Sequence, residues 1–254
     1  MEQKNHRLLM RALTILEYIA KKPEGVSFKE ICDISGLPKS STHNLVQTLC
    51  NMNYLQKKGN YNEYQIGLKA FEVGSSYLST NPFFSAAKGI VENISKECRQ
   101  TAHLGILVGT DVLYLYKFDS NQSLRIASEI GKRMPAHATA IGKALLAGLS
   151  DEELQNLYSG YAFNHITKNT IVSFSVLLEQ IENIRKTQFA TEKEESSPFI
   201  QCIAVPILNR QKKTIAAISV SYPVYQKEAD AEMYTNVLLE GKHLLENLLF
   251  SLNI

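Results

Sequence analysis

The 254-residue sequence lacks several features that would indicate other classes of protein. It contains no tryptophan, and its four cysteines (Cys32, Cys50, Cys98 and Cys202) lie far apart, without the C-x-x-C pairs of zinc ribbons. No apolar run reaches the roughly 18 residues of a membrane span, and no signal-peptide cleavage pattern follows the N-terminus. We therefore expect a cytoplasmic protein without membrane contact, disulfides, metal or cofactor.

Acidic residues are missing from one stretch, Ile34 to Asn62, although the net charge of the whole chain is only +2. Residues 1–66 carry nine lysines and arginines against six aspartates and glutamates. A segment that approaches phosphates avoids carboxylates, because like charges there weaken binding. The gap favours contact with nucleic acid, although chance composition explains it equally well.

A nucleotide-binding loop is also missing. The segment "HATAIGKALLA" contains Gly142 and Lys143, which resemble the end of the phosphate-binding pattern G-x-x-x-x-G-K-[ST]. However, His137 stands where the first glycine is needed, and Ala144 stands where a hydroxyl would hold Mg²⁺. The segment therefore requires another explanation.

What the sequence does contain, in its first 52 residues, is three consecutive helical patterns. An apolar stripe from Leu9 to Ala20 ends at the "KKPEG" segment. A second helix opens with the capping box formed by Ser27 and Glu30 and ends at Gly36. The third begins at "LPKSS" and continues through "STHNLVQTLCNM". A short helix, a glycine-containing turn and a longer helix predict a helix-turn-helix motif.

Polar side chains line one face of the third predicted helix. Ser40, His43, Asn44 and Gln47 recur at helical spacing, and short side chains of this kind can contact bases and phosphates in the major groove. A predicted hairpin follows and would form a wing against the DNA backbone. An ordinary solvated helix face is the alternative. The predicted DNA-binding residues are Lys39, Ser40, Ser41, Thr42, His43, Asn44, Gln47, Lys57 and Lys58.

The remaining chain predicts a linker and a second domain. A helical segment ends at Asn81 and Pro82, since the residue before proline avoids helix. Helices then alternate with antiparallel strand pairs, which is typical of an α+β domain. We expect a winged helix-turn-helix domain over residues 1–66, a linker helix over 67–81 and an α+β domain over 82–254.

Several segments resemble the IclR family of transcriptional regulators. They are "RALTILEYIA", "GLPKSSTHNLVQTLCNMNYL", "YQIGLKAFEVG", "MPAHATAIGKALLAGLSDEEL" and "EESSPFIQCIAVPI". The resemblance implies that the second domain is a GAF-like effector-binding domain and that the HATAIGKALLA segment lines a small-molecule pocket. In such a pocket the amides of Ala140 and Ile141, at a helix start, would bind a ligand carboxylate.

The family pattern implies further pocket residues in this chain. The full set implied is Ser123, Ile126, Met134, Ala140, Ile141, Glu192, Ile200, Cys202, Ser219 and Ser221. Two positions depart from the pattern. Phe199 replaces a usual glycine, whose backbone freedom a phenylalanine lacks, and we expect it to narrow or close the pocket. Asn44 replaces a frequent arginine, and we expect this to change contact with phosphates or bases.

The resemblance predicts a DNA-binding regulator, most often a repressor, controlled by a small carboxylic acid. A homodimer, or a dimer of dimers, would bind a palindromic operator in double-stranded DNA. Two alternatives stay open. One is a regulator with a closed pocket that binds no ligand. The other is an enzyme with Cys202 as nucleophile, although no histidine spacing indicates a catalytic base.

Overall fold

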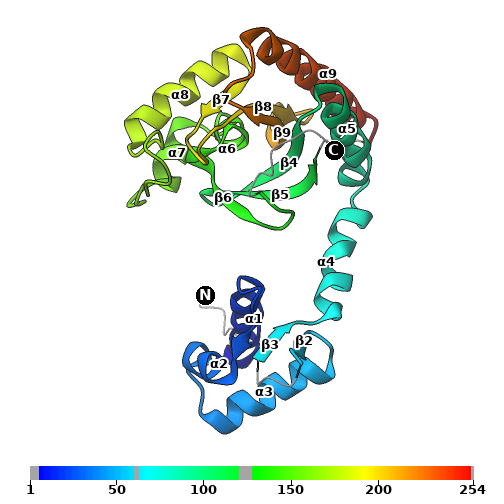
Figure 1. Ribbon diagram of the computed structural model, residues 1–254, viewed down its shortest axis with the longest axis vertical. Coiled ribbons are helices and arrows are strands. Elements are labelled where there is room, and N and C mark those ends of the chain that lie inside the picture. The colour runs from blue at the N-terminus through cyan, green and yellow to red at the C-terminus, as the bar shows by residue number, and fades with distance from the viewer. Residues whose placement is uncertain (1–5, 60–62, 120–127, 253–254) are drawn as a thin grey trace. The chain divides into compact units, whose positions relative to one another are not determined.

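The computed structural model describes residues 6–59, 63–119 and 128–252. The chain divides into two compact units, Met1–Thr80 and Asn81–Ile254. Figure 1 labels most of the helices and strands of both units. None of the described helices is both long and apolar enough to cross a membrane.

The first unit contains the predicted winged helix-turn-helix fold and also includes the helix that was predicted as a linker. Its elements are α1 (Arg7–Ala20), β1 (Val26–Ser27), α2 (Phe28–Ser35), α3 (Lys39–Asn51), β2 (Leu55–Lys57), β3 (Glu63–Ile66) and α4 (Leu68–Thr80). The strands form an antiparallel sheet in the order β1-β3-β2. Apolar residues of α1, α2, α3 and the sheet form one core, which includes Ile15, Ile19, Ile31, Val46 and Leu55.

Local signals fix the ends of α2 as the sequence predicts. The Ser27 hydroxyl accepts a hydrogen bond from the Glu30 amide, and the Glu30 carboxylate accepts one from the Ser27 amide. Gly36 ends the helix in the left-handed conformation (φ 57°), which glycine adopts without steric cost. The chain can therefore turn sharply into α3.

The second unit is built on a six-stranded antiparallel sheet. Its strands are β4 (Thr101–Val108), β5 (Asp111–Phe118), β6 (Arg133–Pro135), β7 (Ala190–Lys193), β8 (Ile200–Leu208) and β9 (Thr214–Pro223). They lie in the order β6-β5-β4-β9-β8-β7, so that β4 and β9, which are distant in sequence, pair at the centre. This pairing decides which side chains share a face of the sheet.

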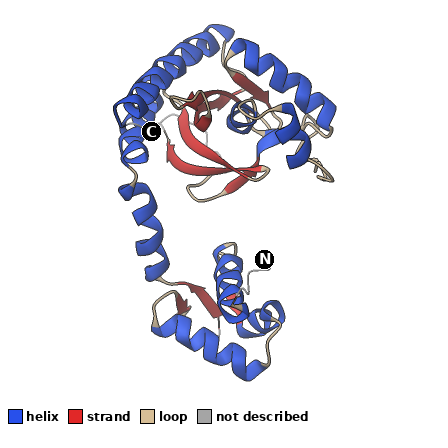
Figure 2. Ribbon diagram, turned by 180° about the vertical axis from the view of Figure 1, so that it is seen from behind, coloured by secondary structure: helices blue, strands red, loops and turns tan. Residues whose placement is uncertain are grey.

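Helices cover both faces of this sheet, as the two opposite views show (Figure 1, Figure 2). On one face α5 (Pro82–Cys98) packs against α9 (Glu228–Leu252), and both contact the central strands. The other face is covered by α6 (Ala140–Leu146), which contacts α8 (Phe174–Thr187) and follows a short 3-10 turn, η1 (Ala136–Ala138). The helix α7 (Asp151–Leu157) joins this second layer through the buried Leu154. The α+β class is thus confirmed.

The Gly142–Lys143 pair has a structural explanation in this unit. A Cβ atom on Gly142 would lie 2.3 Å from the Ala136 carbonyl oxygen, so only glycine lets α6 approach η1 so closely. Lys143 is fully buried, and its Nζ donates to both carboxylate oxygens of Glu195 (2.8 and 3.0 Å) and to the Gln180 side chain (2.7 Å). Gly142, through close packing, and Lys143, through its buried ion pair, therefore fix the position of α6.

Candidate functional site

The exposed face of α3 carries most of the predicted DNA-binding side chains. Lys39, Ser40, Ser41, His43, Asn44 and Gln47 are all exposed. Val46 and Leu49, on the opposite face, are buried in the core of the first unit. The amide of Gln47 donates to Asn51 (3.0 Å), and the His43 ring makes an edge contact with Phe28 (6.0 Å between centroids). A polar helix face of this kind suits the major groove.

Thr42 is a correction to the predicted set. Its side chain is fully buried, and its hydroxyl lies 3.0 Å from that of Ser35. The same oxygen is within hydrogen-bond distance of the Pro38 and Leu37 carbonyl oxygens. Thr42 was grouped with its polar neighbours in the sequence, but the 100° step per residue of a helix turns its side chain into the core. Thr42 fastens α2 to α3 and does not reach a ligand.

The two lysines of the predicted wing differ in their surroundings. Lys57 is exposed at the end of β2. Lys58 is half-buried, and its ammonium group donates to the carbonyl oxygen of Glu24, in the turn that precedes β1. Lys57 is therefore the better placed of the two for a phosphate contact.

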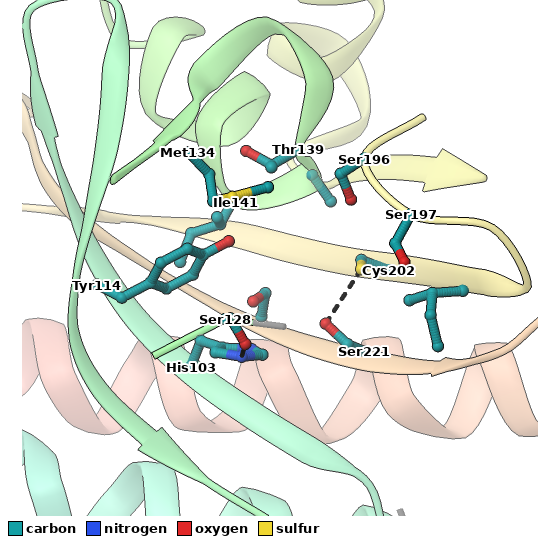
Figure 3. A pocket seen from close by; sticks show the side chains of 13 residues that line it. His103, Tyr114, Ser128, Met134, Thr139, Ile141, Ser196, Ser197, Cys202 and Ser221 are labelled. Atoms are coloured by element: carbon teal, nitrogen blue, oxygen red, sulfur yellow. Dashed lines mark hydrogen bonds between the residues drawn. The ribbon is translucent and has the colours of Figure 1, made fainter. Parts of the chain in front are cut away.

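A cavity of about 80 Å³ lies in the second unit between α6 and the sheet. Figure 3 shows its lining side chains, with Thr139 and Ile141 on one side and His103, Ser128 and Ser221 on the other. Seven of the residues implied by the family pattern line it: Met134, Ala140, Ile141, Ile200, Cys202, Ser219 and Ser221. None of the described lining residues is a lysine or an arginine.

The helical side of the cavity is formed by the start of α6. Thr139 caps the helix, and its hydroxyl accepts a hydrogen bond from the Gly142 amide (3.1 Å). The first amides of a helix, here those of Ala140 and Ile141, have no partner within the helix and favour an anion. The groups with polar hydrogens that face the described part of the cavity are therefore neutral: backbone amides, hydroxyls and the Cys202 thiol.

The sheet side of the cavity carries a row of polar side chains on adjacent strands. Cys202 and Ser221 are cross-strand partners, and their Sγ and Oγ atoms lie 3.0 Å apart. The Cys202 thiol donates to Glu192 (3.0 Å) on the next strand. Glu192 is buried and also accepts from the Glu195 amide (2.9 Å) and the Ser196 hydroxyl (3.2 Å). Glu192 therefore supports the cavity from behind Cys202 and is not one of its lining residues.

The protonation of this row follows from burial. Burial raises the pKa of the Cys202 thiol well above its usual value, and the neighbouring Glu192 carboxyl raises it further. Burial also raises the pKa of Glu192, although its hydrogen bonds with Cys202 and Glu195 oppose the shift. A nucleophilic cysteine needs a lowered thiol pKa, so Cys202 has the opposite of what catalysis requires.

His103 is a cavity residue that the sequence did not single out. It lies on β4 opposite Ser219 of β9, and its Nε2 atom lies 2.7 Å from the Ser128 hydroxyl. Burial, together with the nearby charge of Lys117, lowers the pKa of His103 to about 3. The imidazole is therefore neutral at physiological pH.

Other lining residues were also missed. Tyr114, Ser128, Thr139, Ser196 and Ser197 lie on β5, in loops or before α6. The capping position of Thr139, directly before the predicted helix, was the one available signal. Two implied residues, Ser123 and Ile126, lie outside the described residues.

The expectation that Phe199 closes the cavity is wrong. Its side chain is 69% exposed and is not among the lining residues. Its backbone adopts the left-handed conformation (φ 64°) that glycine would supply, and its amide donates to Glu194 (2.9 Å). The ring of Phe199 therefore lies in solvent, and the next residue, Ile200, lines the cavity.

Comparisons with known proteins agree with this arrangement. The model of the IclR helix-turn-helix domain matches residues 8–59, and the model of the bacterial transcriptional regulator IclR C-terminal domain matches residues 75–241. The chain is 34% identical over 223 residues to the HTH-type transcriptional regulator XynR of Escherichia coli (strain K12), covering 88% of each protein. It is 31% identical over 218 residues to the transcriptional repressor IclR of the same organism, covering 85% of this chain and 80% of the relative.

A solved structure shares the fold over both units. It is an IclR homologue from Microbacterium hydrocarbonoxydans in complex with 4-hydroxybenzoate, with a TM-score of 0.84 and 20% sequence identity. The match covers 96% of this chain and 99% of that one. With family models matching both units, the chain belongs to the IclR family of bacterial transcriptional regulators.

Proposed function

We propose that this regulator is a repressor that binds a palindromic operator as a homodimer and that a small carboxylic acid in the cavity of the second unit controls its affinity for DNA. The observation that carries the proposal is the cavity itself, between the start of α6 and a polar sheet floor. The repressor among the relatives and the ligand in the Microbacterium structure support the same reading.

Operator recognition belongs to the exposed face of α3. Its short polar side chains can pair with base edges, and Lys39 and Lys57 can pair with phosphates. Asn44 supplies an amide that can bond an adenine edge, where the family frequently has an arginine. Two copies of α3 in successive major grooves would lie roughly 34 Å apart, which requires a two-fold symmetric operator.

Dimerisation has support in α4. None of its thirteen residues is buried within the chain, and Leu68 and Phe71 are 65% and 71% exposed. An isolated helix of this length is only marginally stable in water, so we expect a second copy to cover its apolar side chains. Sedimentation should give a dimer, and Phe71→Asp should shift it towards monomer.

Control by a ligand requires that the acid bind one arrangement of the protein more tightly than another. The amides of Ala140 and Ile141 would bind its carboxylate, with the hydroxyls of Ser219 and Ser221 and the Cys202 thiol around the rest of the molecule. The two other hypotheses have less support. An exposed Phe199 does not close the cavity, and the protonated thiol of Cys202 does not favour an enzyme.

The deciding experiment measures DNA binding and ligand binding together. Fluorescence anisotropy with labelled DNA selected by the protein should show salt-dependent binding, and His43→Ala and Gln47→Ala should each weaken binding to the selected site by about 1–3 kcal/mol. Lys57→Ala should weaken all sequences alike and lower the salt slope by about one. A thermal-shift screen of small acids should then find a ligand that changes the operator affinity. Absence of any such ligand, with DNA binding intact, would refute the control mechanism.

A further inference from the structure

One nitrogen atom of a residue that lines the cavity has no hydrogen-bond partner among the described residues. The Nδ1 atom of His103 is buried and makes no hydrogen bond with any residue that the structure describes, whereas Nε2 pairs with Ser128. The whole residue is 2% exposed. A buried polar atom without a partner is costly, and it calls for an explanation such as a bound water molecule or ligand.

His103 lies on the sheet side of the cavity, across from the start of α6. Figure 3 shows it with Ser128 below the cavity, while Thr139 and Ile141 lie above it. Ser219, its cross-strand partner, lines the same floor. A ligand whose carboxylate lies at α6 would therefore direct its other end, or a substituent, towards His103.

The chemistry of a neutral imidazole selects the partner group. If the Ser128 hydroxyl donates to Nε2, then Nδ1 carries the proton and donates; if Nε2 donates to Ser128, then Nδ1 accepts. A ligand hydroxyl can satisfy either tautomer, because it both donates and accepts. A methyl group can satisfy neither, and a second carboxylate can only accept.

The cavity also limits the size of the ligand. Its volume of about 80 Å³ is well below the ~150 Å³ of an engineered cavity that binds benzene. The volume enclosed by the described lining therefore favours a short aliphatic acid over an aromatic one.

We infer that the effector is a short aliphatic hydroxy acid and that His103 is the residue that selects its hydroxyl group. This inference rests on the proposed control by an acid and specifies which acid. His103 contributes discrimination against acids of the same length that lack the hydroxyl. A water molecule in the free cavity would be replaced by the ligand hydroxyl without loss of a hydrogen bond, whereas a methyl group would leave Nδ1 unpaired.

The test is calorimetric titration of the full-length protein with matched acids. The hydroxylated probes are lactate (both enantiomers), glycerate and 3-hydroxypropionate; the reference without a hydroxyl is propionate; 4-hydroxybenzoate tests size. At least one hydroxylated probe should bind roughly 10- to 100-fold more tightly than propionate. 4-Hydroxybenzoate should bind more weakly than that probe.

Two near-isosteric variants separate recognition from folding. His103→Asn keeps a polar atom at the position of Nδ1, and His103→Gln keeps one at the position of Nε2 beside Ser128. The preference for the hydroxylated probe should survive in His103→Asn and fall to within about 3-fold in His103→Gln, with a cooperative thermal unfolding transition of the second unit confirming that both variants are folded.

The outcomes distinguish this inference from the function on which it rests. If acids bind but propionate equals the best hydroxy acid, or if the preference persists in His103→Gln, the inference is wrong and control by an acid stands. If 4-hydroxybenzoate binds most tightly, the size limit is wrong and the inference fails with it. If no acid binds the wild-type protein, both proposals fail.

Discussion

The two units of the chain place their polar side chains in opposite ways. In the first unit α3 presents Ser40, His43 and Gln47 to solvent and buries its apolar face. In the second unit α6 and the sheet place Lys143, Glu192 and His103 in the interior, where each is at most 3% exposed. Polar side chains on a surface form hydrogen bonds with water, whereas buried ones need a partner in the protein or in a bound molecule. The difference predicts that substitutions on the exposed face of α3 change DNA binding with little effect on stability, whereas removing a buried partner in the second unit lowers its stability.

The largest effect is expected at the buried ion pair. Lys143→Met removes the partner of Glu195 and leaves a buried carboxylate unpaired, which should lower the free energy of unfolding of the second unit by about 3–5 kcal/mol. Urea unfolding followed by circular dichroism measures this. The matched control is Lys143→Met with Glu195→Leu, which removes both charges and should recover much of the loss. If the double variant is no more stable than the single one, the loss of stability comes from the packing around Lys143 and not from the unpaired carboxylate.

The neutral His103 should make stability depend on pH. Its folded pKa of about 3 lies below the unfolded value of 6.5, so the folded state binds fewer protons between these values. The contribution of neutral His103 to the free energy of unfolding is therefore complete above pH 6.5. It is lost as the pH falls towards 3, at up to about 1.4 kcal/mol per pH unit. Carboxylates and other histidines add their own pH dependence, so the measurement is the difference between wild type and His103→Gln. Equal slopes for the two proteins would mean that the pKa of His103 is the same in the folded and unfolded states.

Neighbouring residues of α3 allow the comparison to be tested within one helix. Thr42→Val removes the hydroxyl that pairs with Ser35 and should destabilise the first unit by about 1–3 kcal/mol. His43→Ala, one residue further, should change the free energy of unfolding by less than about 0.5 kcal/mol, because surface substitutions seldom do more. Thermal unfolding of both variants, with anisotropy on operator DNA, measures the contrast. If Thr42→Val is as stable as the wild type but no longer binds DNA, Thr42 is a DNA-contact residue after all.

How far the sequence predicts each unit follows from the same contrast. The order of α1, α2 and α3, the capping box at Ser27 and the exposed positions of α3 follow from helical periodicity, which is a local property. Thr42 was misplaced because it ends a run of four polar residues that begins at Lys39, although its spacing from Val46 and Leu49 puts it on their buried face. The prediction was wrong for this one residue, whereas the helix-turn-helix motif itself was predicted correctly.

The cavity could be predicted only where the family pattern supplied it. His103 and Ser219 are cross-strand partners 116 positions apart in sequence, and nothing local indicates that β4 and β9 pair in that register. The partners of Lys143 lie in α8 and after β7, so sequence alone could not show that this lysine is buried. Buried polar contacts between segments far apart in the sequence are thus the features of the site that only the structure reveals.

Phe199 gives the smallest expected effect and tests the corrected reading of the cavity. A non-glycine residue in the left-handed conformation costs roughly 1–2 kcal/mol, and glycine offsets part of that gain through its greater freedom in the unfolded chain. Phe199→Gly should therefore stabilise the second unit by about 0.5–1 kcal/mol, whereas Phe199→Ala, which keeps a Cβ atom, should not. Because the ring points to solvent, neither variant should change the affinity of the cavity for an acid. A tighter-binding Phe199→Ala variant would show that the ring obstructs the cavity in solution, and the expectation drawn from the family pattern would then be correct.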